Sequence, residues 1–223
     1  MGAIACLSPL QTVLTILILT GLVARFGTDA LAGYGIGARL EFLLVPLAFA
    51  IGVASVPLVG MAIGAGHVAR ARRVTWIAAT LAGALLGALG LVVAVAPGLW
   101  SRLFTDEPSV LAAAASYFRW AGPCYALFGF GLCLYFSSLA AGRVGGPVLA
   151  GTLRLAVVAV GGWMLASAAA PAWTIFALVA AAMAAYGLAT WLVVWRADWR
   201  PAGIRAGAML PAGAAPPGRA APR

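Results

Sequence analysis

Residues 33–73 read GYGIGARLEFLLVPLAFAIGVASVPLVGMAIGAGHVARARR. An apolar run long enough to cross a bilayer starts beside Arg39 and Glu41, contains Pro46 and Pro57, and ends in a cluster of arginines. A membrane helix tolerates internal prolines and is oriented by the charges at its ends. This combination is not typical of a buried helix in a water-soluble protein. The stretch therefore predicts a bent membrane-spanning helix, with the two prolines at structural or hinge positions.

The composition extends this expectation to the whole chain. Of the 223 residues, 64% are hydrophobic and 9% are charged, whereas a soluble domain carries roughly 25% charged residues. Too few charges remain to cover a water-exposed surface, so lipid must be the solvent. The apolar runs are much longer than the ~10 residues of a membrane barrel strand. The predicted fold class is therefore an all-α integral membrane bundle.

Six apolar runs meet the length of about 20 residues that one crossing needs. The expected helices are 4–24, 38–62, 74–96, 115–140, 147–169 and 172–195. Together they would form one domain over residues 1–196. Residues 197–223, rich in Pro, Gly, Ala and Arg, are expected to be a disordered tail. Gly83 and Gly87, four residues apart, predict a close contact face on the third helix.

The arginines orient the bundle. With six crossings both termini share one side, and the links 64–73 and 141–146 and the tail on that side hold most of the arginines. The opposite links hold only Arg25, Arg39 and Arg102, together with three acidic residues. The positive-inside rule then predicts a multi-pass protein of the plasma (inner) membrane with both termini in the cytoplasm.

The sequence argues against several classes of function. The net charge of +9 does not indicate nucleic-acid binding, because the arginines lie in links and tail rather than on a soluble basic face. The lone histidine, His67, lies in a link, and the chain contains no Lys. No Ser–His dyad, His-based metal site or phosphate-binding loop can therefore be built. We expect no enzyme activity, no catalytic residue, no bound metal and no organic cofactor.

Glu41 is the one carboxylate expected inside the membrane, about 7 Å into the second helix. A carboxylate partly withdrawn from water there could take up a proton or a cation, which makes it the ion-coupling candidate. The alternative is an interfacial Glu41 paired with Arg39, Arg25 or a neighbouring helix.

The first helix carries a row of polar side chains, including Gln11, Thr12 and Thr15. Gln11 and Thr15 are four residues apart and share a face, with Thr12 close by. In lipid such groups need polar partners, so they predict either contacts between helices or the lining of a wet cavity. We take the three as cleft or substrate-binding candidates.

The fourth helix is rich in aromatic residues, of which Tyr125 and Phe128 are candidates for a substrate wall. Such rings usually pack or lie at a membrane interface, but they also bind flat organic cations through cation–π contacts. Arg119 and Arg154 are expected to be structural, reaching toward the interface or pairing with a backbone carbonyl.

Two long segments carry a family resemblance. Residues 26–73 combine a Phe-Gly turn, Arg-x-Glu, a helix proline and Gly-x-x-x-Gly-Ala-Gly before the arginines. Residues 103–154 run from LFTDEPS to AGRVGGPVLAGTLR. In order and spacing they resemble one lobe of the MATE (multidrug and toxic compound extrusion) family, and the Arg-x-Glu entry is most similar to the C-terminal lobe.

The resemblance implies one six-helix lobe of a twelve-helix transporter. It further implies export of organic cations and other drugs by alternating access, with H+ or Na+ as the coupling ion. The expected partners are the lipid bilayer, a small organic cation and a second lobe or second copy of the chain. The start at Met1, with almost no residues before the first helix, favours a truncated product.

The chain departs from the family pattern in one respect. Some members carry a carboxylate on the first helix of the C-terminal lobe for Na+, and the first helix here has no Asp or Glu. This leaves Glu41 as the candidate in this lobe. Two alternatives remain: a related lobe that flips lipid-linked oligosaccharides or polysaccharides, with more cations lining its cleft, and a membrane fragment that does not transport.

Overall fold

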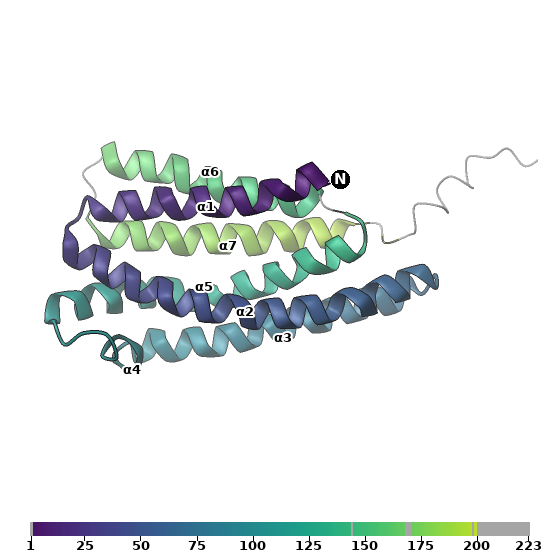
Figure 1. Ribbon diagram of the computed structural model, residues 1–223, viewed down its shortest axis with the longest axis horizontal. Coiled ribbons are helices and arrows are strands. Elements are labelled where there is room, and N and C mark those ends of the chain that lie inside the picture. Colours follow the sequence, from purple (N-terminus) through teal and green to yellow (C-terminus); the bar gives the residue numbers. More distant parts are fainter. Residues whose placement is uncertain (1, 144, 168–170, 198, 200–223) are drawn as a thin grey trace, which may run out of the picture.

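The computed structural model describes residues 2–143, 145–167, 171–197 and 199, and every regular element in these ranges is a helix (Figure 1). In chain order the helices are α1 (Gly2–Ala24), α2 (Thr28–Gly64), α3 (Val68–Val95), α4 (Gly98–Ser101), α5 (Pro108–Ala140), α6 (Gly145–Ser167) and α7 (Trp173–Arg196).

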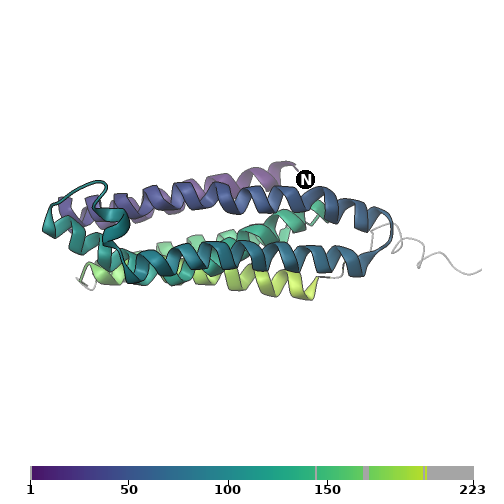
Figure 2. The same cartoon turned by 90° about the horizontal axis from the view of Figure 1, so that it is seen from below.

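All helices except the short α4 are long and apolar enough to cross a membrane, which gives six candidate spans. They run along the long axis of the molecule, as the two perpendicular views show (Figures 1 and 2). The predicted fold class, an all-α membrane bundle, is therefore confirmed.

Several helices begin earlier than the sequence predicted. α2 begins at Thr28 rather than at 38, and α5 begins at Pro108 rather than at 115. The added first turns of α2 are rich in glycine, which weakens a helix in water but lets two helices approach closely in a membrane. At Gly33 a Cβ atom would lie 2.7 Å from the Cβ of Ala113 in α5. Nearly all of the predicted tail, 197–223, lies outside the described residues.

α5 is the central helix and packs against α2, α3 and α7. Small residues set its crossing with α3: at Gly122 a Cβ atom would lie 2.5 Å from the carbonyl oxygen of Gly90. A Cβ atom at Gly87 would lie 2.8 Å from Ala126, and one at Gly83 would lie 3.1 Å from the same residue's carbonyl oxygen. The predicted contact face at Gly83 and Gly87 is therefore confirmed, and it extends to Gly90.

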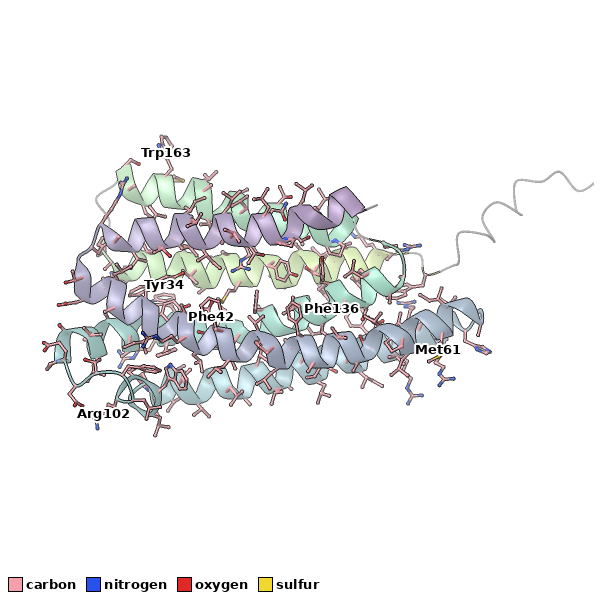
Figure 3. The ribbon with its side chains drawn as sticks, viewed as in Figure 1. Tyr34, Phe42, Met61, Arg102, Phe136 and Trp163 are labelled. Atoms are coloured by element: carbon pink, nitrogen blue, oxygen red, sulfur yellow. The ribbon has the colours of Figure 1, made fainter. Side chains whose placement is uncertain are left out.

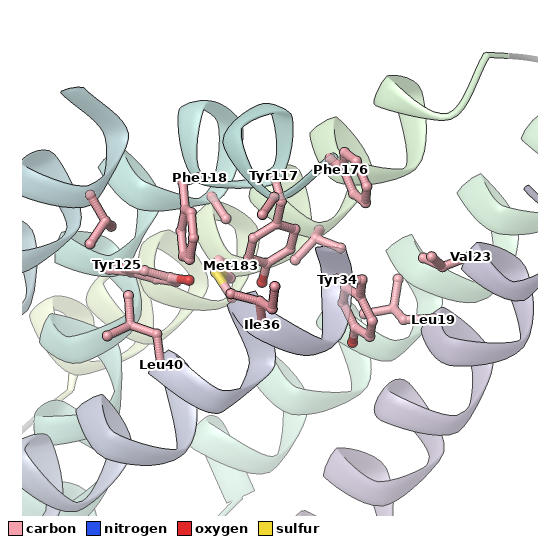
Figure 4. Packing of buried hydrophobic residues seen from close by; sticks show 14 of the residues in the cluster. Leu19, Val23, Tyr34, Ile36, Leu40, Tyr117, Phe118, Tyr125, Phe176 and Met183 are labelled. Carbon is pink, nitrogen blue, oxygen red and sulfur yellow. The ribbon is translucent and has the colours of Figure 1, made fainter. Parts of the chain in front are cut away.

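The helices form two groups, with α1, α6 and α7 along one side and α2, α3 and α5 along the other (Figure 1). Between the groups, the Tyr117 ring of α5 packs edge-on against the Phe176 ring of α7, with ring centroids 5.6 Å apart. Figure 4 shows Tyr117 and Tyr125 extending from α5 toward Ile36 and Leu40 of α2.

The outer surface of the bundle is apolar. Phe42, Met61 and Trp163 are 68%, 65% and 74% exposed, and they lie on α2 and α6 (Figure 3). Contact with lipid removes the cost of exposing such side chains to water, so this surface agrees with a membrane-embedded bundle.

Candidate functional site

A cavity of about 410 Å3 lies between the two helix groups. Its wall is built by five of the six long helices, all except α3. Its lining residues include Ser8, Gln11, Thr12 and Thr15 of α1, Val45 of α2, Phe128 and Tyr135 of α5, Gly151 and Arg154 of α6, and Tyr186 of α7. Most of them lie in the half of the bundle that contains the N-terminal end of α1.

The polar wall of the cavity comes from α1. Gln11 donates a hydrogen bond from Nε2 to Thr152 Oγ1 of α6, at 2.8 Å. The hydroxyls of Thr12 and Thr15 instead donate to carbonyls of their own helix, four residues back, at 3.0 and 2.7 Å. All three predicted α1 residues therefore line the cavity, but only Gln11 also joins two helices through its side chain.

The aromatic wall of the cavity comes mainly from α5, and only one of the two aromatic candidates on that helix belongs to it. Phe128 lines the cavity, together with Tyr135 and Tyr186. Tyr125 is buried and does not line it. Instead, the Tyr125 hydroxyl lies 3.4 Å from a carboxylate oxygen of Glu41.

Glu41 lies deeper in the bundle than the sequence predicted. Because α2 starts at Thr28, Glu41 follows 13 residues later, or about 20 Å along the helix rather than about 7 Å. The side chain is half-buried and accepts hydrogen bonds from the hydroxyls of Tyr117 and Tyr125. Its partners thus come from a neighbouring helix.

Arg39 is not one of those partners. Its guanidinium lies 4.9 Å from the centre of the Phe104 ring, in the link between α4 and α5. Trp100 of α4 donates to the carbonyl of Ile36 at 3.0 Å, which holds the same link against α2. The alternative in which Glu41 pairs with Arg39 is therefore not the arrangement in the structure.

The carboxylate and the cavity are adjacent. Val45, a cavity residue, lies one helical turn after Glu41, and Phe128 lies three residues after Tyr125. The spacing along each helix is about 6 Å or less. The site thus has two parts: a carboxylate held by two tyrosines, and a cavity with polar and aromatic walls beside it.

The remaining candidates separate into two groups. Arg154 lines the cavity, with its guanidinium 5.2 Å from the centre of the Phe128 ring. Arg119, Pro46 and Pro57 are exposed on the bundle surface, and none of the three contributes to the wall of this cavity.

The sequence interpretation missed two tyrosines of the site, Tyr117 and Tyr186, and did not select Tyr135 from the aromatic residues of the fourth predicted helix. Tyr117 is eight residues before Tyr125, so the two share a face of one helix. That spacing could have identified Tyr117. Nothing in the sequence indicated that Glu41, 76 residues earlier, would be its partner.

Six candidate membrane spans, five of which build the wall of a cavity beside a carboxylate, describe a multi-pass membrane protein with an internal binding space. The MatE family model matches residues 5–164, which is more than half of the chain. The chain belongs to the MatE family, whose members are transporters. The resemblance predicted from the sequence is therefore confirmed.

Solved structures agree with this assignment at the level of the fold. The MATE transporter VcmN of Vibrio cholerae, in its bent form, has 23% sequence identity and a TM-score of 0.78 over 87% of this chain. The MATE transporter ClbM, in complex with Rb+, has 22% identity and a TM-score of 0.77 over 92%. The chain spans 44% and 47% of their respective lengths. A comparison with curated proteins found no match.

Proposed function

We propose that the chain is one lobe of a secondary active efflux transporter, most like a C-terminal MATE lobe. It exports organic cations and other drugs by alternating access, in exchange for H+ or Na+. The observation that carries the proposal is the cavity of about 410 Å3 next to Glu41. A protein that exchanges an ion for an organic molecule needs both a binding space and an ionisable group close to it.

Glu41 suits the coupling role for a physical reason. A carboxylate in a membrane is costly unless a proton, a cation or hydrogen-bond donors compensate for its charge. Two tyrosine hydroxyls supply donors in this state. Arrival of H+ or Na+ would change what these hydroxyls bind, and the ion would then favour one packing of α2 against α5 over another.

A complete transport pathway requires further protein. The chain spans less than half of each of the two MATE transporters described above. The proposed partner is therefore a second lobe or a second copy of this chain. A lobe for lipid-linked saccharides is less well supported, because Arg154 is the sole cation among the described residues of the cavity wall.

Transport can be tested with protein purified from its own membrane, together with any polypeptide that copurifies. The protein is reconstituted into vesicles that are loaded with acid or with Na+. These vesicles should take up tetraphenylphosphonium as H+ or Na+ leaves them. Collapse of the gradient with nigericin, for H+, or with monensin, for Na+, should stop the accumulation. Absence of gradient-driven uptake with either ion would contradict the proposal.

The proposed location is the plasma membrane, with both termini in the cytoplasm. Alkaline phosphatase fused to the C-terminus should then be inactive in intact bacteria, because this enzyme folds only outside the cytoplasm. Green fluorescent protein at the same position should be fluorescent. The reverse pair of results would overturn the orientation.

A further inference from the structure

A second cavity, of about 240 Å3, lies where α5, α6 and α7 meet at the end of the bundle that contains the N-terminus (Figure 1). α5 contributes Ser138, the link to α6 contributes Arg143, and α7 and the segment after it contribute Val193, Val194 and Trp199. None of the described residues that line it also lines the cavity of the candidate site. We call it the Arg143 cavity.

The local sequence directs Arg143 back toward Ser138. Gly142 follows the end of α5 with a φ of 69°, in the left-handed region that favours glycine. The Arg143 N–H donates to the carbonyl of Ser138 at 2.8 Å, and the Gly142 N–H donates to the carbonyl of Leu139 at 2.9 Å. This pair of hydrogen bonds is the Schellman ending of a helix. The chain therefore turns back at the end of α5, and both Arg143 and Ser138 line the cavity.

The polar groups of the Arg143 cavity are hydrogen-bond donors without an acceptor. Arg143 Nη2 is buried without a hydrogen bond. Ser138 is only 5% exposed, and no hydrogen bond of its hydroxyl is found among the described residues. A guanidinium can only donate, and none of the described lining residues is acidic. α6 also begins here, at Gly145, and its N-terminal end is electropositive. The chemistry of the cavity therefore fits an anion.

Tryptophans and arginines place this cavity at the level of the lipid headgroups. Trp191 and Trp195 of α7 stack with ring centroids 6.2 Å apart and are 38% and 56% exposed. Tryptophan is enriched where a membrane meets water, and two cavity residues, Val193 and Val194, lie between these tryptophans in the sequence. Further exposed arginines at the same end of the bundle attract anionic lipids: Arg70, Arg72, Arg73 and Arg196.

We propose that the Arg143 cavity binds the phosphate group of an anionic phospholipid, with Arg143 and Ser138 as hydrogen-bond donors. The planar guanidinium can donate two parallel hydrogen bonds to phosphate oxygens. Most of the wall is nonpolar, which suits the glycerol carbons next to a lipid phosphate. A free phosphate ion would lose its hydration against the same wall. A lipid bound here joins α5, α6 and α7 at one end of the bundle, and this role is separate from that of the proposed substrate cavity.

Two lipids that differ in net charge test this site. Palmitoyl-oleoyl phosphatidylglycerol is an anion, and palmitoyl-oleoyl phosphatidylcholine has the same acyl chains and phosphodiester but no net charge. Native mass spectrometry of the purified full chain measures the dissociation constant of the first lipid bound. Phosphatidylglycerol should bind at least about tenfold more tightly, the size expected for one charge-assisted hydrogen bond. Inorganic phosphate added in large excess should not displace it.

Arg143→Gln should remove most of this preference, because it removes both the charge and the planar fork. Arg196→Gln changes an exposed arginine outside the cavity, so it is the matched control and should leave the preference unchanged. Ala197→Leu fills the cavity without changing any charge, since Ala197 lines it, and should weaken the binding of phosphatidylglycerol. If the glutamine variant does not fold, the leucine variant decides: an undiminished affinity contradicts the site.

Equal affinities for the two lipids, or tighter binding of phosphatidylcholine, would overturn the proposal. So would a preference that survives Arg143→Gln, or one that Arg196→Gln removes to the same extent, because either result indicates attraction by the surface arginines as a whole. Displacement of the lipid by inorganic phosphate would assign the cavity to a small anion instead. None of these measurements involves transport, so their outcome is separate from that of the vesicle assay.

Discussion

Replacing Glu41 by Gln is expected to abolish ion-driven export of tetraphenylphosphonium. Glutamine keeps the size of the side chain and can still accept from Tyr117 and Tyr125. It cannot lose a proton or neutralise a bound Na+, so the step that exchanges ion for substrate is removed. Uptake into vesicles under an imposed gradient is the measurement, at equal protein content.

Three further variants give this prediction internal controls. Glu107→Gln changes an exposed carboxylate at the start of α5 and should leave transport unchanged. Tyr117→Phe and Tyr125→Phe each remove one donor to Glu41, and each should impair transport. Full export by the Glu41→Gln variant would remove Glu41 from the coupling role.

Gly90→Leu is expected to prevent stable packing of α3 on α5. A side chain at this position would enter the backbone of Gly122, which has no flexible atoms that can move aside. Overpacking of this kind costs about 3 kcal/mol or more, a large fraction of the 5–15 kcal/mol typical of a folded domain. Size-exclusion chromatography of detergent-solubilised protein after stepwise heating would report the loss as aggregation at lower temperature.

Gly60→Leu is the matched control for that substitution. Gly60 is also within a long helix, but no atom lies within 4 Å of where its Cβ would be, so the added side chain starts in open space. Its heating profile should resemble that of the unmodified chain. Equal behaviour of the two leucine variants would show that the contact of Gly90 with Gly122 does not determine stability.

The number and kind of helices could be predicted from the sequence because each span is a local property. Twenty apolar residues in a row must cross a bilayer as a helix, whatever they pack against. The start of α2 could not be predicted in the same way. Residues 28–37 contain three glycines that suggest a link in water. The closeness of α5, with Ala113 against Gly33 and the Tyr117 ring against Gly37, explains why glycine belongs to a helix there.

The candidate site likewise has a part that the sequence predicts and a part that it does not. The face shared by Gln11 and Thr15 follows from helical periodicity, and both residues line the cavity. The pairing of Glu41 with Tyr117 joins residues 76 positions apart, and periodicity along one helix contains no information about it. Arg154 was expected to be structural, and its position over Phe128 depends on how α6 faces α5.

Tyr125 and Phe128 are three residues apart in α5, so the partner of Glu41 and the ring beneath Arg154 belong to one turn of one helix. A displacement of this turn moves both side chains together. If Glu41 binds the coupling ion and the cavity binds the substrate, as proposed, ion occupancy and ligand affinity depend on one another, and thermodynamic linkage requires that dependence to be reciprocal. An ion that lowers the affinity for a ligand must itself bind less tightly when that ligand is bound.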